Sequence, residues 1–159
     1  MKNFLLTTVM GFTLATAAQA EPVSYMLDAS HSQIVFSYNH LGFSTTTGMF
    51  SGFEGRIELD AEDPAASSVE VSFPAQSLIT GWPAREGHFL TEDFFSADAN
   101  PLVTFTSTAV EVTSDNTGMI TGDLTMNGIT KSVVLDATMN QLANHPMANR
   151  PWAGFDATT

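Results

Sequence analysis

Cysteine is absent from this 159-residue chain. Its absence excludes a disulfide framework, and it excludes metal sites and nucleophiles that depend on a thiolate. Burial and hydrogen bonding must therefore hold the fold together. A single domain of this length is large enough to do so, because it can enclose either a sizeable core or one internal cavity.

Basic residues are also scarce. Five Lys and Arg residues stand against 17 Asp and Glu residues, which gives a formal net charge of −12 at pH 7. Such a chain is repelled by phosphate backbones and by anionic bilayer surfaces. We therefore expect no nucleic-acid partner, and the sequence contains no phosphate loop or dinucleotide fingerprint.

Long apolar runs are limited to one, Phe4 to Ala17, which the small residues Ala18-Gln19-Ala20 follow. This arrangement is typical of a secretory signal peptide with its cleavage site. We expect cleavage after Ala20, so that residues 1–20 are the signal peptide and residues 21–159 form one mature domain. The run is too short for a comfortable membrane span. The mature protein is therefore expected to be periplasmic and not membrane-spanning.

Helical periodicity is rare, whereas turn signals recur between stretches rich in Val, Thr, Ile and Phe. This pattern predicts an all-β fold with antiparallel neighbours. The predicted strands cover residues 32–40, 45–59 (one long strand bent at its glycines), 68–73, 102–113, 119–126, 130–141 and 154–159.

The connections between the later strands read as hairpins. Asp115 to Gly118 is one turn signal, and Asn127-Gly128 is the strongest short hairpin signal known. Within residues 102–113 the apolar positions change from odd to even numbers, which predicts a β-bulge near Ser107 or Ala109.

One short helix is expected between the strands, in residues 74–101. Thr91 is a suitable N-cap for it, and Glu92 and Asp93 would occupy its first turn. Asn100-Pro101 would end it, because a residue before proline avoids helical geometry.

The final residues, 154–159, alternate as they would in the middle of a strand. A long, apolar, unpaired edge is an aggregation liability that complete domains avoid. We therefore expect the domain to be C-terminally incomplete, with further strands closing the sheet.

The stretch SQIVFSYNH, residues 32–40, raises the question of function. In a strand, Ile34, Phe36, Tyr38 and His40 would share one face. That face turns either to a packed core or to a ligand cavity. His40 is correspondingly either a core histidine with a hydrogen-bond partner or a polar contact for a ligand.

Three long stretches of the chain resemble the signature motifs of a known family. They are DASHSQIVFSYNHLGFSTTTGMFSGFEGRIELD (28–60), REGHFLTEDFFSADANPLVTFTST (85–108) and GDLTMNGITKSVVLDATMN (122–140). By them the chain is similar to the YceI-like family of periplasmic, lipocalin-like proteins. The resemblance implies an extended antiparallel lipocalin-like β-barrel. It also implies an apolar tunnel for a long-chain polyisoprenoid, a prenylated quinone or a fatty-acyl lipid.

Small residues interrupt the apolar rows, among them Ser51, Gly55 and Gly122. If such residues face inward opposite one another, they leave room for a guest, because native interiors hold few voids larger than water. Bulges that turn them outward are the alternative. The candidate ligand-binding residues are Ile34, Phe36, Tyr38, His40, Met49, Phe53, Arg85, His88, Phe105, Leu124 and Leu135.

Arg85 and His88 lie near the predicted helix, where they would meet a head group at the barrel mouth. A structural ion pair with Glu86, Asp93 or another carboxylate is the alternative role.

Catalytic motifs are not apparent. The four histidines lack metal-binding spacing, so we expect no metal and no cofactor. No nucleophile elbow accompanies Asp28 and His31, and we interpret Asp28, Ser30 and His31 as a turn that bonds backbone groups. We therefore expect a carrier and not an enzyme. The alternatives are an enzyme that acts on a lipid through His31 or His88, and a module that docks on an envelope complex. Pairing of two barrels is left open.

Overall fold

The computed structural model describes residues 21–159, so the predicted signal peptide lies outside the described residues. The elements in chain order are β1 (Val23–Met26), β2 (Ile34–His40), β3 (Ser44–Phe50), β4 (Glu54–Leu59), η1 (Pro64–Ala66), β5 (Ser68–Pro74), η2 (Ala75–Ser77), α1 (Pro83–Phe89), β6 (Leu102–Ser114), β7 (Thr117–Met126), β8 (Ile129–Asn144) and β9 (Pro151–Thr158).

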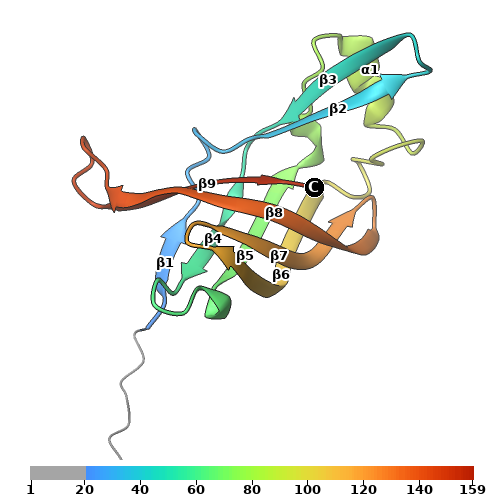
Figure 1. Ribbon diagram of the computed structural model, residues 1–159. Helices are drawn as coiled ribbons and strands as arrows, with labels where there is room; N and C mark the ends of the chain where they lie inside the picture. Colours follow the sequence, from blue (N-terminus) through green and yellow to red (C-terminus); the bar gives the residue numbers. More distant parts are fainter. Residues whose placement is uncertain (1–20) are drawn as a thin grey trace, which may run out of the picture.

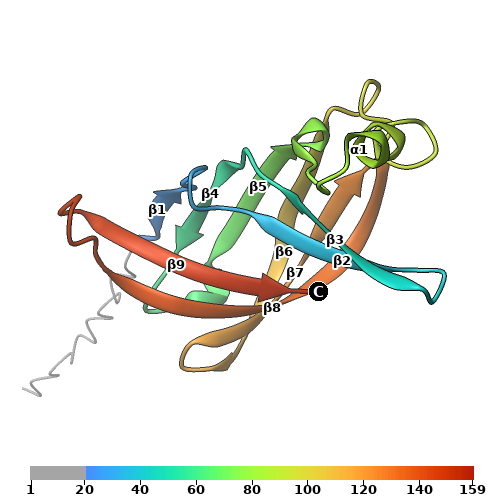
Figure 2. The same cartoon turned by 90° about the horizontal axis from the view of Figure 1, so that it is seen from above.

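Seven strands form one antiparallel sheet in the order β1-β4-β5-β6-β7-β8-β9. The sheet curls into a nearly closed barrel, with β1 and β9 as its two edge strands (Figure 1). Strands β2 and β3 form a separate two-stranded hairpin. This hairpin lies across the barrel, and its turn projects beyond the other strands (Figure 2). The predicted fold, an extended antiparallel barrel with one short helix, is confirmed.

The predicted hairpins and bulge are present. Strand β6 turns into β7 at Asp115-Asn116, and β7 turns into β8 at Asn127-Gly128, where both residues have positive φ angles of 51° and 68°. The β6–β7 register shifts between Ser107 and Ala109. The odd-to-even change of apolar positions was therefore a reliable bulge signal, since one extra residue restores the inward direction of the row.

The prediction of one bent strand over residues 45–59 is wrong. The chain forms β3, leaves the hairpin at Ser51, and enters the barrel sheet at Glu54 as β4. Gly52 allows this change of sheet because its φ of +73° is accessible to glycine at little cost. The alternation of apolar and polar residues continues through β3 and β4, so it does not reveal that the two halves pair with different strands.

The predicted position of the helix is also wrong. Helix α1 begins at Pro83, in the first turn, and ends before Thr91. The Thr91 hydroxyl donates to the His88 carbonyl oxygen over 2.7 Å, so Thr91 closes the helix and does not open it. The missed signal was Pro83, because proline is favoured at the first helical position.

A cluster of phenylalanine rings fills the end of the barrel beside α1. We call this cluster, Phe50, Phe53, Phe73 and Phe95, the phenylalanine end. Its ring centroids lie 4.8 Å apart for Phe53 and Phe73, 5.1 Å for Phe50 and Phe73, and 5.4 Å for Phe50 and Phe95. These are normal aromatic packing distances, so the rings pack as in a core, and Phe50, Phe73 and Phe95 also border the cavity described below.

Among residues 21–159, no helix has the length and apolar character needed to cross a bilayer.

Candidate ligand-binding cavity

A cavity of about 750 Å³ lies within the barrel and opens to solvent. Its volume falls in the range of ligand pockets, about 300–1,000 Å³. Each barrel strand from β4 to β9 contributes apolar side chains to the wall, and the β2–β3 hairpin adds Ile34, Phe36 and Phe50. Representative wall residues, one from each of β4 to β9, are Ile57, Val71, Phe105, Ile120, Leu135 and Phe155.

The period of two along each strand aims these side chains inward. In β8, Val133, Leu135, Ala137 and Met139 all line the cavity, whereas Val134 between them is 42 % exposed. In β6 the lining residues are Val103 and Phe105 before the bulge, and Val110 and Val112 after it. The alternation that predicts the strands therefore also places their apolar rows on the cavity wall.

The lining is apolar except at one end. There the β6–β7 turn supplies Asp115, Asn116 and Thr117, and β9 supplies Asp156. Across the sheet, Thr117 pairs with Thr138, and Thr138 pairs with Asp156. We call this the turn end of the cavity, and it lies opposite the phenylalanine end.

Carboxylates give the turn end a negative character. Asp115 and Asp156 are both exposed there, in a chain of net charge −12. The Asn140 amide donates to the Asp156 carboxylate over 3.0 Å. An anionic head group would be repelled at this end, whereas a neutral or cationic one would be accepted.

The combination of a nearly closed antiparallel barrel, an apolar interior and a polar end can be compared with known proteins. Residues 25–159 match the YceI-like domain family. The chain belongs to the YceI-like family.

Curated relatives agree with this assignment. A UPF0312 protein of Pseudomonas syringae pv. tomato is 35% identical over 159 residues, which cover 99% of this chain and 80% of the relative. A UPF0312 protein of Ectopseudomonas mendocina is 37% identical over 161 residues, which cover 100% of this chain and 83% of the relative.

Solved structures show the same fold. The crystal structure of the Campylobacter jejuni YCEI protein superposes with a TM-score of 0.65 at 31% identity, over 82% of this chain and 76% of that chain. The crystal structure of Burkholderia cenocepacia BcnA superposes with a TM-score of 0.67 at 24% identity, over 74% of this chain and 73% of that chain. The second likeness bears on the fold alone.

Of the candidate ligand-binding residues, one group lies in this YceI-like cavity. The structure brings together Ile34, Phe36, Phe105, Leu124 and Leu135 on its wall. Their contact with a ligand stays a prediction. Sequence reasoning missed the polar turn end, although residues in the turns of a barrel are natural candidates because loops at strand ends often carry binding groups.

A second group packs against protein. Tyr38 lies against Phe89, with ring centroids 5.7 Å apart. Phe53 is buried in the phenylalanine end against Phe73. The Met49 backbone bridges to Ile79, with both N–H···O distances at 2.9 Å. All three candidates lie outside the cavity lining. The even-numbered row of β2 faces the cavity only at Ile34 and Phe36, because the hairpin leaves the barrel beyond them.

The polar candidates lie outside the cavity lining as well. His40 is exposed near the β2–β3 turn. The Arg85 guanidinium lies 5.5 Å from the Trp82 ring centroid, and His88 Nε2 lies 3.3 Å from the Asp93 carboxylate. The alternative structural role, a contact with the Asp93 carboxylate, therefore describes the geometry of His88.

Helix α1 is tied to the preceding loop by Glu86. Its carboxylate accepts hydrogen bonds from the backbone N–H groups of Thr80 (2.6 Å) and Gly81 (3.0 Å). The bond from Thr80 is the main reason that the pKa of Glu86 lies below its usual value.

The expectation that glycines leave free space on the wall is wrong at Gly122. A Cβ atom placed on Gly122 would lie 2.4 Å from the Phe105 ring. The ring therefore occupies the space that glycine leaves. Phe36 does the same at Gly48, where the corresponding distance is 2.5 Å. The cavity lies beside this contact, and Phe105 itself forms part of its wall.

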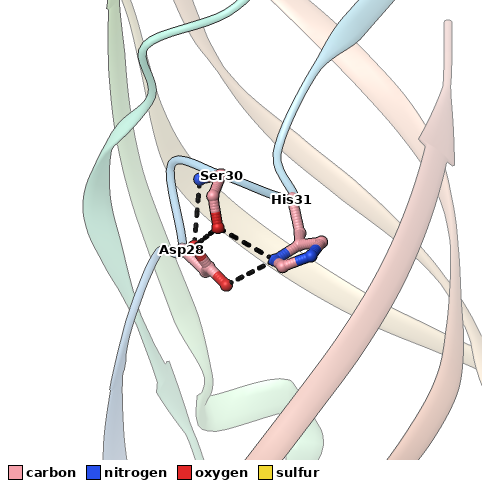
Figure 3. A network of polar contacts seen from close by, with 3 residues as sticks. All are labelled: Asp28, Ser30 and His31. Carbon is pink, nitrogen blue, oxygen red and sulfur yellow. Dashed lines mark hydrogen bonds and ion pairs between the residues drawn. The ribbon is translucent and has the colours of Figure 1, made fainter.

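The DASHS turn precedes β2 and forms a compact polar network (Figure 3). The Ser30 hydroxyl donates to Asp28 Oδ1 over 2.6 Å, and His31 Nδ1 lies 2.7 Å from Asp28 Oδ2. These bonds, the Ser30 hydroxyl first, lower the pKa of Asp28 to about 2. The turn is present as predicted, with side-chain bonds in addition to the Ser30 N–H that donates to Asp28.

This network lacks the geometry of a catalytic triad. Ser30 Oγ lies 3.0 Å from His31 Nδ1, the same ring nitrogen that Asp28 contacts. A triad needs the carboxylate and the hydroxyl on opposite ring nitrogens, so that the ring can relay a proton from one side while it is oriented from the other. Within residues 21–159, no group of three or more His, Asp or Glu side chains is arranged to hold a metal ion.

A second cavity, of about 810 Å³, lies between the edge strands β1 and β9. Polar groups make up more of its lining, including Asp28, His31, Asn140 and Arg150. We regard the first cavity as the candidate site, because its wall is the apolar interior of the barrel and the second lies along the unpaired edges.

Proposed function

We propose that this YceI-like barrel binds a long-chain amphipathic lipid, such as a polyisoprenoid, a prenylated quinone or a fatty-acyl lipid, and stores or transports it in the periplasm. The observation that carries the proposal is the cavity of about 750 Å³, apolar along its length and polar at one end. This arrangement matches an amphiphile, whose chain needs a dry wall and whose head needs hydrogen-bonding partners.

Burial of the chain supplies the affinity. Each methylene removed from water contributes about 0.8 kcal/mol. A prenyl or acyl chain brings many such groups, so the hydrophobic term exceeds the cost of ordering the chain. The polar groups need only select the head group and fix the direction of entry.

The negative charge at the turn end limits which lipid head groups can bind there. Asp115 and Asp156 disfavour a pyrophosphate or a free carboxylate. A quinone ring, a hydroxyl, an amide or an amine would be accepted. We therefore favour a prenylated quinone or a fatty amide over a polyisoprenyl pyrophosphate.

The lipid should remain with the protein during mild purification. Native mass spectrometry followed by organic extraction would identify it, and the same spectrum would show whether two barrels pair. An empty protein that also fails to bind a prenylated quinone would overturn the proposal.

A matched pair of variants makes the test specific to the cavity. Leu135 lines the cavity, and its neighbour Val134 is on the outer face of the same strand. Leu135→Trp should fill the cavity and reduce lipid retention at least tenfold. Val134→Trp adds the same ring outside and should retain lipid normally. Equal retention by the two variants would place the ligand elsewhere.

A further inference from the structure

The turn of the β2–β3 hairpin presents apolar side chains to solvent. We call Leu41, Gly42 and Phe43 the hairpin tip. Leu41 is 81% exposed and Phe43 is 89% exposed. Both views of the structure show this turn extending beyond the barrel strands and α1 (Figures 1 and 2).

The turn chemistry makes the exposed leucine unusual. Leu41 and Gly42 have φ angles of +56° and +83°, the signs that a type I′ hairpin turn requires. Asn, Asp and Gly adopt such angles readily, whereas Leu is strained there. The Asn39 side chain holds the turn by accepting a hydrogen bond from the Gly42 N–H, and the Phe43 N–H donates to the His40 carbonyl over 3.0 Å. Strained residues that a fold maintains are typical of functional sites.

The hairpin is also free of formal charge. Residues 29–53 contain no Asp, Glu, Lys or Arg, although the chain as a whole carries a net charge of −12. Beside the tip stand Asn39, His40 and the run Ser44 to Thr47, which are polar and, with His neutral, carry no charge. Apolar side chains above a neutral, hydrogen-bonding collar match the acyl boundary and head-group layers of a bilayer.

The narrow shape of the tip favours a bilayer over a protein partner. A specific protein interface buries about 800 Å² on each partner. Two side chains on a tight turn offer far less than that. A bilayer accepts single side chains, because lipid closes around whatever enters it.

We propose that the hairpin tip is a membrane-docking element that inserts Leu41 and Phe43 into the interface of an electrically neutral bilayer. The base of the same hairpin, at Ile34 and Phe36, forms part of the cavity wall. The hairpin would therefore connect the docked tip with a wall of the cavity. This inference goes beyond the proposed function, since it does not depend on which ligand the cavity takes.

Vesicle flotation tests the proposal. The purified protein should float with phosphatidylcholine vesicles. Vesicles that contain phosphatidylglycerol should bind it several-fold less at low salt, because the acidic barrel is repelled, and added salt should reduce the difference. A protein that stays unbound on phosphatidylcholine vesicles would overturn the proposal.

Variants locate the contact. Leu41→Asn with Phe43→Ser should reduce vesicle binding at least tenfold, and Asn suits the positive φ, so the thermal midpoint should be unchanged. Met147→Ser is the control, because Met147 is 88% exposed in the β8–β9 loop and lies outside the tip. Wild-type binding by the tip variant, or equal losses in both variants, would contradict the proposal.

The cavity variant separates this proposal from the proposed function. Leu135→Trp should lose lipid retention while it binds vesicles as the wild type does. If instead the tip variant crosslinks less to an envelope protein and binds vesicles normally, the tip is a protein-docking element and the membrane proposal is wrong.

Discussion

The two ends of the barrel are built from the same alternating strands, yet one is packed and the other is hollow. At the phenylalanine end, Phe50, Phe53 and Phe73 are each 5–6 % exposed and their rings touch. Towards the turn end, the inward rows carry aliphatic side chains such as Val112, Ile120 and Val133, which leave a cavity. A row of side chains that points into the barrel is therefore not enough to form a packed core.

Side-chain size explains the difference. Rings that interdigitate across a barrel fill its interior, whereas smaller aliphatic side chains on opposite walls do not reach one another. The phenylalanine end then supplies much of the stability that the hollow end lacks. A barrel built in this way can hold a ligand without losing its fold when the ligand leaves.

The largest expected effect is on stability at the packed end. Phe53→Ala should lower the free energy of unfolding by about 3–5 kcal/mol, because Phe53 is buried against Phe73 and lies outside the cavity lining. Leu135→Ala should lower it by less, since the Leu135 side chain borders the cavity and has fewer packing partners to lose. Urea unfolding of the ligand-free protein measures both. Comparable losses would show that the cavity wall is packed like a core.

A smaller effect is expected where the two regions meet, at Gly122. An added Cβ would lie 2.4 Å from the Phe105 ring and 2.6 Å from the Thr106 carbonyl oxygen. Gly122→Ala should therefore cost about 1–3 kcal/mol and push the ring into the cavity, weakening lipid retention.

Gly87 in α1 is the matched control, because a Cβ there meets nothing within 4 Å. Gly87→Ala should stabilise the protein by about 0.5–1 kcal/mol through helix propensity, with retention unchanged. Thermal unfolding and extraction of both variants check the pair. If Gly122→Ala left the stability unchanged, the Phe105 ring would have to adopt another rotamer without cost.

The smallest effect concerns a surface site outside both ends, the DASHS turn. The pKa of Asp28 is lowered from 3.8 to about 2, so its contribution to stability is present above about pH 4 and is lost as the pH falls towards 2. Ser30→Ala should raise this pKa towards its ordinary value. The Ser30→Ala variant should have a lower thermal midpoint than the wild type at pH 5, and this difference should vanish near pH 2.

A carboxyl NMR titration of Asp28 reads the effect directly. Lipid retention should be the same in wild type and Ser30→Ala at pH 7, because the turn lies outside the lining of the barrel cavity. An Asp28 that titrates near 3.8 in the wild type would count against the network.

Much of the fold was predictable because strands and turns have short-range sequence signals. The period of two, the Asn127-Gly128 turn and the change of phase near Ser107 are all short-range signals, and each matches the structure. The split between β3 and β4 was not predictable, because the choice of pairing partner depends on residues far away in the chain. The start of α1 at Pro83 is a local signal, because proline is favoured at the first helical position.

The cavity itself was only partly predictable. Inward rows such as that of Leu135 follow from alternation, but the place where facing rows fail to meet depends on the three-dimensional distances between strands. Gly122 illustrates this limit: its missing side chain suggests a void, and the Phe105 ring fills it. Likewise, His40 extends the row of Ile34 along β2, but the hairpin carries it away from the barrel.

The most direct test of the central claim is the position of a bound chain. Crystals of the protein grown with a bromine-labelled prenyl or fatty-acyl amphiphile would locate the chain by anomalous scattering. The account predicts bromine peaks inside the barrel, within about 4–5 Å of Leu124 and Leu135, which line the cavity. Peaks confined to the outer surface or to the cleft between β1 and β9, with an empty barrel, would contradict it.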